Sequence, residues 1–581
     1  MTCRQAITTR LGMALLWISC LLPQGGCRKE PDLTQLASQK QTSSEEEDLA
    51  QAISLIGRLD TEPFGQIQPL LIFHLNRWIE NQSHDPQWIL EPLLNRPLFL
   101  SIDDHPPLEQ LMFHLSDVFY LQETSWLHSI AEWVDKQDQR EHLKRFADLL
   151  PAGLSKEDRA QLNTTCRLFD WSVRNLQLQP LLAYPTTGSG ENLRERNVAP
   201  RLGDDGPGYM QIPHDVLSYG SGDAWQRGRI FIQLARQRQI QVVYLGIRAD
   251  KKRRTQPWLT AAMIGEHLYL FDNQLGLPLL AGGGTRIATL ADLKDDPTVL
   301  ESLAIDGQPY RVKQADLEDV VAMVDACHCA ISQRMMTLEK HLAGENQMVL
   351  SVTPGRISRR LRSVFDIDYT ELLPTSMETF LFKVGRQQRQ ESPGNPQNLA
   401  DARKKFLLTT SSSKLVQGRR LFMRGQFGDS TLTRSGQGAR NAKTLLLSSR
   451  MSDEGIESIL TSAETQKLVG LVRLQTDSDE VWRQKVESAY FVAEESKKHA
   501  TFWISMIHME EGNYIAAINW LEKRTLATDD PGPFDHLAQY NLARCFEATG
   551  QLEKAREILL QSSSTQSRGD HLLAKRLSAQ P

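Results

Sequence analysis

The chain has 581 residues, of which 40% are hydrophobic and 24% are charged, and its formal net charge is −5. This composition is typical of globular proteins. The near balance of charges excludes a general electrostatic attraction to nucleic acid, so we expect no nucleic-acid partner. At a domain size of ~150 residues, the length predicts about three or four folded units.

The N-terminal segment, residues 1–27, has the features of an export signal. Two arginines precede an apolar run at residues 11–22, which is shorter than the ~20 residues of a membrane-spanning helix but matches the apolar part of a signal peptide. The small residues directly before Cys27 resemble the lipoprotein signal of bacteria. The resemblance implies an exported cell-envelope protein that a lipid on Cys27 anchors to the membrane, with ordinary cleavage or an uncleaved anchor as the alternatives. Residues 28–48 are polar and predict a flexible tether.

The rest of the chain predicts an α+β fold that is predominantly α. The units that we expect are, in chain order, a helical region at 49–155, an α+β domain at 156–300, an α/β extension and linker at 301–400, a mixed linker region at 401–475 and helical repeats at 476–581. Within the α+β domain, a capped amphipathic segment and three apolar runs predict one helix and three strands, at 163–176, 242–247, 258–264 and 267–271.

Four cysteines follow the signal, too few and too scattered for a disulfide framework. The run Cys327-His328-Cys329 suggests a metal site, but residues 314–342 contain few helix breakers and predict one long helix. Residues i and i+2 point apart on a helix and cannot chelate together. We therefore interpret these two thiols as buried structural cysteines, and we expect no metal and no cofactor.

The C-terminal segment contains a repeat. The sequence at 512–517 recurs in related form at 550–555, and a predicted helix precedes each copy, at 500–511 and 537–549. Small residues at these positions resemble the tetratricopeptide repeat, in which two helices cross closely. The resemblance implies a concave helical surface that binds protein or peptide partners.

Gly222 and Asp223 precede an amphipathic helix, an apolar strand at 242–246 ends in glycine, and Trp258 and a strand at 268–272 follow. In these residues and their order, the α+β domain resembles the transglutaminase-like domains of the papain-like thiol enzymes. In that family a cysteine at the helix start attacks an acyl group, a histidine takes its proton, and an aspartate orients the histidine.

The reactive positions depart from this pattern. Ala224 stands at the position of the cysteine and Gln256 at that of the histidine, whereas Asp272 matches the orienting acid. No cysteine lies between residues 167 and 326 to replace the nucleophile. Alanine has no nucleophile and an amide is no base near neutral pH, so the resemblance implies a domain without thiol acyl transfer.

These observations predict a non-catalytic envelope protein that binds protein or peptide partners through its helical repeats and through a vestigial cleft. The alternative is an active transglutaminase-like hydrolase or acyltransferase with a different arrangement of its site. The expected lining of the cleft is Asp223, Trp225, Gln226, Arg227, Gln256 and Asp272.

Overall fold

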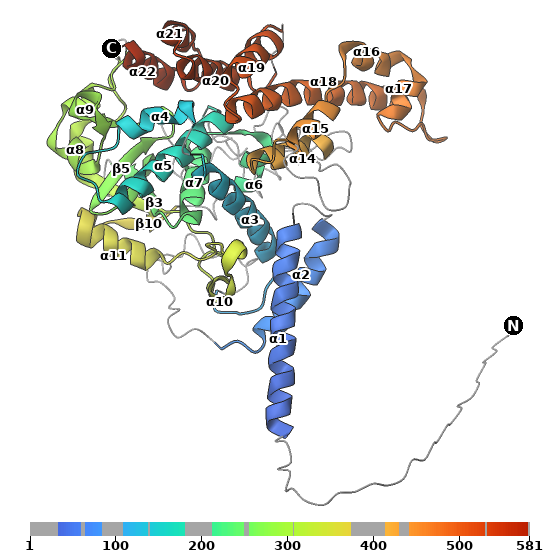
Figure 1. Ribbon diagram of the computed structural model, residues 1–581, viewed down its shortest axis with the longest axis horizontal. Helices are drawn as coiled ribbons and strands as arrows, with labels where there is room; N and C mark the ends of the chain where they lie inside the picture. The colour runs from blue at the N-terminus through green and yellow to red at the C-terminus, as the bar shows by residue number, and fades with distance from the viewer. Residues whose placement is uncertain are drawn as a thin grey trace, which may run out of the picture.

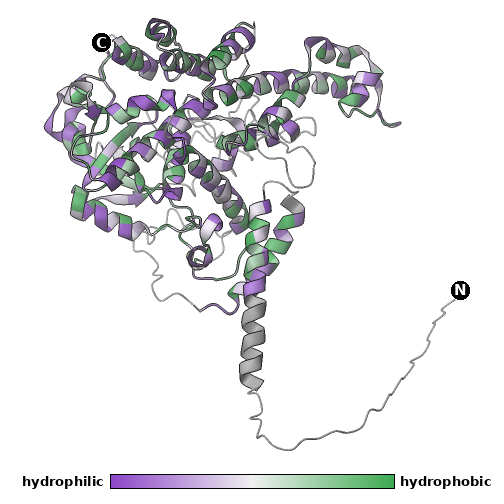
Figure 2. Cartoon of the chain, viewed as in Figure 1, coloured by the Kyte–Doolittle hydropathy of each residue, from purple (hydrophilic) through white to green (hydrophobic). Residues whose placement is uncertain are grey.

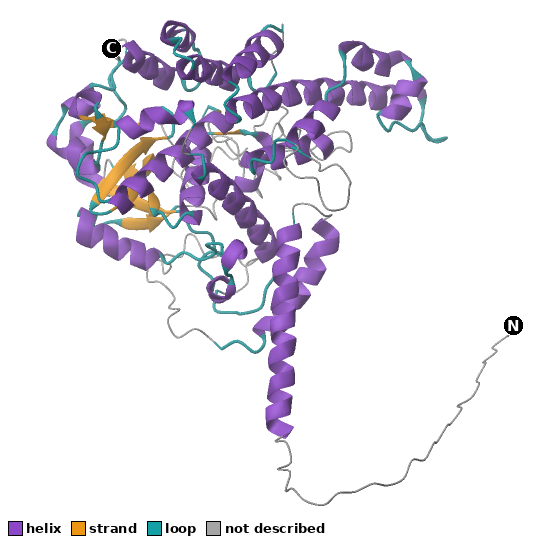
Figure 3. Ribbon diagram, viewed as in Figure 1, coloured by secondary structure: helices purple, strands orange, loops and turns teal. Residues whose placement is uncertain are grey.

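The protein is described from a computed structural model. The described residues are 33–59, 64–83, 108–137, 140–180, 212–248, 255–305, 307–373, 413–428, 441–528 and 532–578. This part of the chain is mostly helical and includes a mixed six-stranded sheet (Figure 3), which confirms the α+β, predominantly α class. The expected export signal at 1–27, with Cys27, lies outside the described residues.

The six-stranded sheet has the order β10-β9-β3-β4-β5-β6. Its strands are β3 Val242–Ile247, β4 Gln256–Ile264, β5 His267–Asp272, β6 Leu277–Pro278, β9 Val320–Val324 and β10 Thr370–Leu372. All neighbours pair antiparallel except β9 and β10, which are parallel. The three strands expected from the apolar runs are confirmed within two residues, because each run is long enough to be buried on both faces.

Strand β9 corrects the prediction of a single helix over 314–342. The structure has instead a 3₁₀ helix at Gln314–Asp319, then β9, a turn, and helix α10 at Gln333–His341. Strand β9 pairs with β3, so the sheet continues past residue 300, where the α+β domain was expected to end. Five consecutive apolar residues form β9, and such a short run fits a buried strand as well as a buried helix.

One face of the sheet is covered by the helices α5 Lys156–Asn175 and α7 Ala224–Gln237. Both helices contact β4, and α3 Leu115–Asp135 packs against both of them. Phenylalanine rings from α5, α7 and β5 meet in the core, with ring centroids 5.1 to 5.5 Å apart: Phe169, Phe231 and Phe271. This packing fixes the start of α7 over the sheet.

The N-terminal region is helical, as expected. Its first two helices are α1 Leu33–Arg58 and α2 Phe64–Ile79, which pack against each other and against α3 and project from the body of the molecule (Figure 1). Helix α1 begins within residues 28–48, so the segment from residue 33 is helical where a flexible tether was expected. Helix α4, Glu141–Asp148, completes this region next to α5.

The segment expected as a mixed linker also contains helices in its described part. These are α14 Ser413–Met423, α15 Ala442–Ser448, α16 Asp453–Thr461 and α17 Ala463–Leu468. Helices α14, α15 and α16 contact the long helix α18, Asp479–Glu510. The second half of α18 is mostly buried, whereas its first half extends with α16 and α17 away from the sheet (Figure 1).

Four further helices and one helical turn follow α18 in successive hairpins. They are α19 Tyr514–Trp520, which continues into a π-helical turn at Leu521–Leu526, then α20 Asp535–Ala548, α21 Leu552–Leu560 and α22 Ser567–Ser578. Hydrophobic and hydrophilic residues alternate along these helices (Figure 2), and each helix packs against the next. Among the helices of the described residues, none combines the length and the apolar character that crossing a bilayer requires.

Candidate functional site

The start of α7 is held by a capping box. The Oδ1 atom of Asp223 accepts the backbone N–H of Gln226 at 2.9 Å, and the Oε1 atom of Gln226 accepts the backbone N–H of Asp223 at 3.0 Å. Ala224 is therefore the first residue of the helix, the position at which the resemblance implies a cysteine in an active thiol enzyme. A helix N-terminus stabilises a thiolate, but this position carries only a buried methyl group.

A buried tyrosine from the sheet supports this helix start. The hydroxyl of Tyr244, in β3, lies 2.8 Å from the carbonyl oxygen of Ala224 and 3.1 Å from that of Trp225. Burial raises the pKa of Tyr244 well above its usual value, and the carboxylates of Asp223 and Asp272 raise it further. The beginning of α7 and the end of β5 thus face one buried phenol, which is neutral and donates its proton.

Asp272 has a different set of partners from the histidine that the resemblance implies. Its Oδ1 atom accepts the backbone N–H groups of Gln274 and Leu275 at 2.8 and 3.0 Å. Its Oδ2 atom accepts the hydroxyl of Tyr310 and, at 3.2 Å, the guanidinium of Arg311. Burial and the neighbouring Asp272 raise the pKa of Tyr310, so the phenol keeps its proton and donates it to the carboxylate.

Trp258 belongs to the same group, because its Nε1 atom donates to the Tyr310 hydroxyl at 2.8 Å. Gln256 is the first residue of β4, opposite Ile247, and its side chain lies outside the described part. The sequence analysis missed Tyr310 and Arg311, because they follow β5 by nearly forty positions and belong to no strand.

Arg227, one turn into α7, connects this site to the C-terminus of the chain. Its Nη1 atom donates to the Oε1 atom of Gln566 at 2.6 Å, and its Nη2 atom donates to the carbonyl oxygen of Leu176 at 2.6 Å. Burial lowers the pKa of Arg227 to about 10. The space left beside it, with Tyr540 and Asp570, has a volume of ≈10 Å³, which holds about one water molecule.

The residues that were expected to line a cleft, where the structure describes their side chains, are therefore buried inside the protein. Trp225 is the most exposed of them at 7%, and the others are Asp223, Gln226, Arg227 and Asp272. Asp223 and Gln226 bond each other, Arg227 bonds Gln566, and Asp272 bonds the backbone of the turn after β5. They belong to the core and do not line an open cleft, which corrects the expectation from the sequence.

A buried network of charges joins α5 to the C-terminal helices. Asp170 accepts Arg544 at 3.0 Å and Arg174 at 2.5 Å, and Arg174 also pairs with Glu510. These arginines hold the pKa of Asp170 well below its usual value, against the effect of burial. Burial, with the adjacent arginines, lowers the pKa of His142, so this histidine is neutral.

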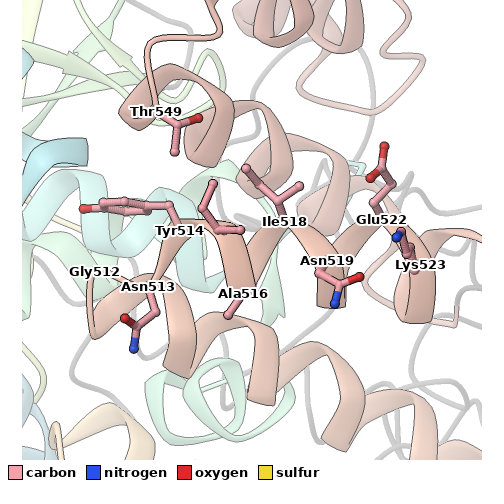
Figure 4. Close-up of a pocket in the computed structure, with 10 residues that line it drawn as sticks. Gly512, Asn513, Tyr514, Ala516, Ile518, Asn519, Glu522, Lys523 and Thr549 are labelled. Atoms are coloured by element: carbon pink, nitrogen blue, oxygen red, sulfur yellow. The ribbon is translucent and has the colours of Figure 1, made fainter.

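This network shows which face of the C-terminal helices is covered. The second half of α18 and α20 present their charged residues to α4 and α5, so this inner surface is buried against the core. An open groove lies instead on α19 and the turn after it (Figure 4), with a volume of ≈790 Å³. Its lining consists of Gly512, Asn513, Tyr514, Ile515, Ala516, Ile518, Asn519, Glu522, Lys523 and Thr549.

Within the part of the chain that the structure describes, no group of three or more His, Cys, Asp or Glu side chains could hold a metal ion. Comparison with known proteins found no matching family model, no matching curated protein and no matching solved structure.

Proposed function

We propose that this protein is a non-catalytic binding scaffold of the cell envelope, in which the groove on α19 takes a peptide segment of a partner protein. The fold of the core derives in this proposal from a transglutaminase-like domain, and α18–α22 correspond to tetratricopeptide-like repeats. Cys27 carries the lipid anchor.

The observation that carries the proposal is the contrast between the two candidate sites. The position of a thiol nucleophile is taken by the buried methyl group of Ala224, and the neighbouring polar side chains are engaged inside the protein. The groove on α19 is open, and Ile515 in it is 69% exposed. Exposed apolar side chains in a groove rimmed by polar residues are typical of protein-binding surfaces.

The chemistry of the groove indicates the kind of partner. Asn513 and Asn519 offer amide groups in the groove, and Glu522 and Lys523 lie at one end (Figure 4). Amides can donate to and accept from a peptide backbone, and an apolar side chain of the peptide would cover Ile515. We expect a short peptide with one apolar anchor and no strong net charge.

Selection from a displayed peptide library, followed by measured dissociation constants, tests the groove. Burying an isoleucine contributes about 1.5–3 kcal/mol, so Ile515→Glu should weaken a selected peptide by about tenfold to a hundredfold. The matched control is Leu468→Glu on α17, because Leu468 is 80% exposed and lies outside the groove. Equal affinities of wild type and Ile515→Glu would contradict the proposal.

The membrane anchor has its own test. Radiolabelled palmitate should enter the wild-type protein in bacterial cells and should be lost in Cys27→Ser. Absence of label in the wild type would remove the anchor and leave the groove proposal intact.

A further inference from the structure

The turn that follows β9 brings two thiols together. Cys327 and Cys329 flank His328 in non-helical backbone, two positions apart, and each thiol shifts the pKa of the other. The Nε2 atom of His328 lies 3.2 Å from the Sγ atom of Cys329. The sequence analysis interpreted these residues as separate structural cysteines, because side chains two positions apart diverge on a helix. The structure has a turn here, so that argument does not apply.

The two thiols differ in exposure and in proton affinity. Cys327 is partly exposed, whereas Cys329 is only 2% exposed. The interaction with Cys329 lowers the pKa of Cys327 against the effect of burial, and the backbone of Ala330 lowers it further. The interaction with Cys327 and burial raise the pKa of Cys329, whose Sγ atom donates to the carbonyl oxygen of Ser116 at 3.8 Å. Since the thiolate is the nucleophilic form, Cys327 is the attacking sulfur.

The charges around Cys327 act in opposite directions, because Asp325 raises its pKa and Arg236 lowers it. Asp325 is the nearest acid on the same loop, and it is bound by the Nε atom of Arg229 at 3.1 Å and the Nε2 atom of Gln233 at 3.0 Å. Arg236 donates to the backbone carbonyl of Asp325 and adds a positive charge that favours the Cys327 thiolate. The arginines of helix α7 thus place positive charge next to the loop that carries the two cysteines.

We propose that Cys327 and Cys329 form a dithiol site that exchanges with the disulfide bond of a partner molecule. The Cys327 thiolate attacks one sulfur of that disulfide, forms a mixed disulfide and releases the other sulfur as a thiolate, which takes a proton from water. Cys329 then gives its proton to His328 and attacks the Sγ atom of Cys327. The second partner sulfur leaves and receives the proton from His328. The partner disulfide is reduced to two thiols, and the two cysteines are oxidised to one disulfide.

A metal site is a poorer account of the same residues. Two thiols and one imidazole nitrogen fall short of the four ligands of a structural zinc ion. In the described ranges no additional His, Cys, Asp or Glu side chain completes such a group. Retention of stoichiometric zinc by the purified protein would contradict the dithiol proposal.

The test uses the full-length reduced protein and oxidised glutathione as the partner disulfide. After incubation, free thiols are alkylated and the peptides are identified by mass spectrometry. The peptide with residues 327–329 should contain an internal disulfide. Cys166 and Cys545 should stay reduced, because both are fully buried, and should be alkylated once the protein is denatured. A wild-type protein in which Cys327 and Cys329 stay reduced, while an unstructured peptide of the same sequence is oxidised, would overturn the proposal.

Two variants separate the roles of the thiols. Cys329→Ser should accumulate glutathione on Cys327, because no second thiol resolves the mixed disulfide, and Cys327→Ser should give neither product. Iodoacetamide should modify Cys327 at least about tenfold faster than Cys166, the ratio expected for each unit of difference in pKa. Equal rates would contradict the assignment of Cys327 as the nucleophile, and this measurement on the wild type does not depend on how the variants fold.

Discussion

Arg544 lies 3.0 Å from Asp170, a residue 374 positions earlier in the chain, and both side chains are buried. Asp170 also binds Arg174 in its own helix, and Arg174 reaches Glu510 in α18. Acids and bases from three helices thus neutralise one another at the surface where the C-terminal helices meet the core.

Replacing Arg544 by methionine should destabilise the protein by about 3–5 kcal/mol, because the substitution leaves Asp170 and Glu547 with fewer partners in a buried place. Urea unfolding measures the change. Arg556→Met is the matched control, since Arg556 pairs with the exposed Glu553 on α21, and a surface pair contributes about 0–1 kcal/mol. Similar losses from both variants would argue against the network as a stabilising contact.

Gly569 in α22 packs against the turn between β5 and β6, and a Cβ atom there would lie 1.8 Å from the carbonyl oxygen of Leu275. Alanine usually favours a helix over glycine by about 1 kcal/mol, but Gly569→Ala should lower the melting temperature because α22 must move away. Gly57→Ala in α1 is the control, because no atom lies within 4 Å of its added Cβ. An unchanged or raised melting temperature for Gly569→Ala would mean that α22 does not dock on this turn.

The capping box of α7 should contribute measurably to stability. Asp223→Ala removes the acceptor for the backbone N–H of Gln226, and the loss of such a cap costs about 0.5–2 kcal/mol. The cap is buried, so we expect a value near the upper end. Ser452→Ala, at the exposed start of α16, should cost less, and thermal unfolding of the two variants compares them.

Glu123 in α3 should make stability fall as the pH rises. Burial raises its pKa from 4.5 to about 8, so between these values the folded protein binds a proton that the unfolded chain releases. The free energy of unfolding then decreases with pH, by at most about 1.4 kcal/mol per unit. Above about pH 8 this contribution becomes constant.

Urea unfolding at several pH values between 5 and 8, about the range set by the two pKa values, measures this slope. Glu123→Gln should reduce the slope, whereas the surface variant Glu553→Gln should keep it. A slope that is the same in wild type and Glu123→Gln would show that another group accounts for it.

The helices and strands of this fold could be predicted where the residues that determine them lie close together in the sequence. Asp223 and Gln226 form a capping pair three positions apart, and the apolar runs of β3, β4 and β5 are long enough to identify. Strand β9 was missed, because a run of five apolar residues fits either a strand or a buried helix. Strand β9 pairs with β3, which lies more than seventy positions earlier, so the residues around β9 do not indicate this pairing.

The environment of the candidate site could not be predicted for a related reason. The sequence indicates that Ala224 begins a helix and that Asp272 ends a strand, and both positions are confirmed. It does not indicate that Gln566 meets Arg227 across 339 positions, or that Tyr310 binds Asp272. These contacts decide whether the site is open, and they arise from the packing of distant segments.

The long separation of the charged partners has a consequence for synthesis. Helix α5 leaves the ribosome 336 residues before Glu510 and 374 residues before Arg544. Until then, among the ion pairs of the described residues, Asp170 and Arg174 have each other and the shorter-range Arg145 as partners, and their burial stays unfavourable. We expect the nascent chain to complete its core only after translation ends. Under the proposed envelope location, a chain that folds late would still be unfolded when it enters an export channel.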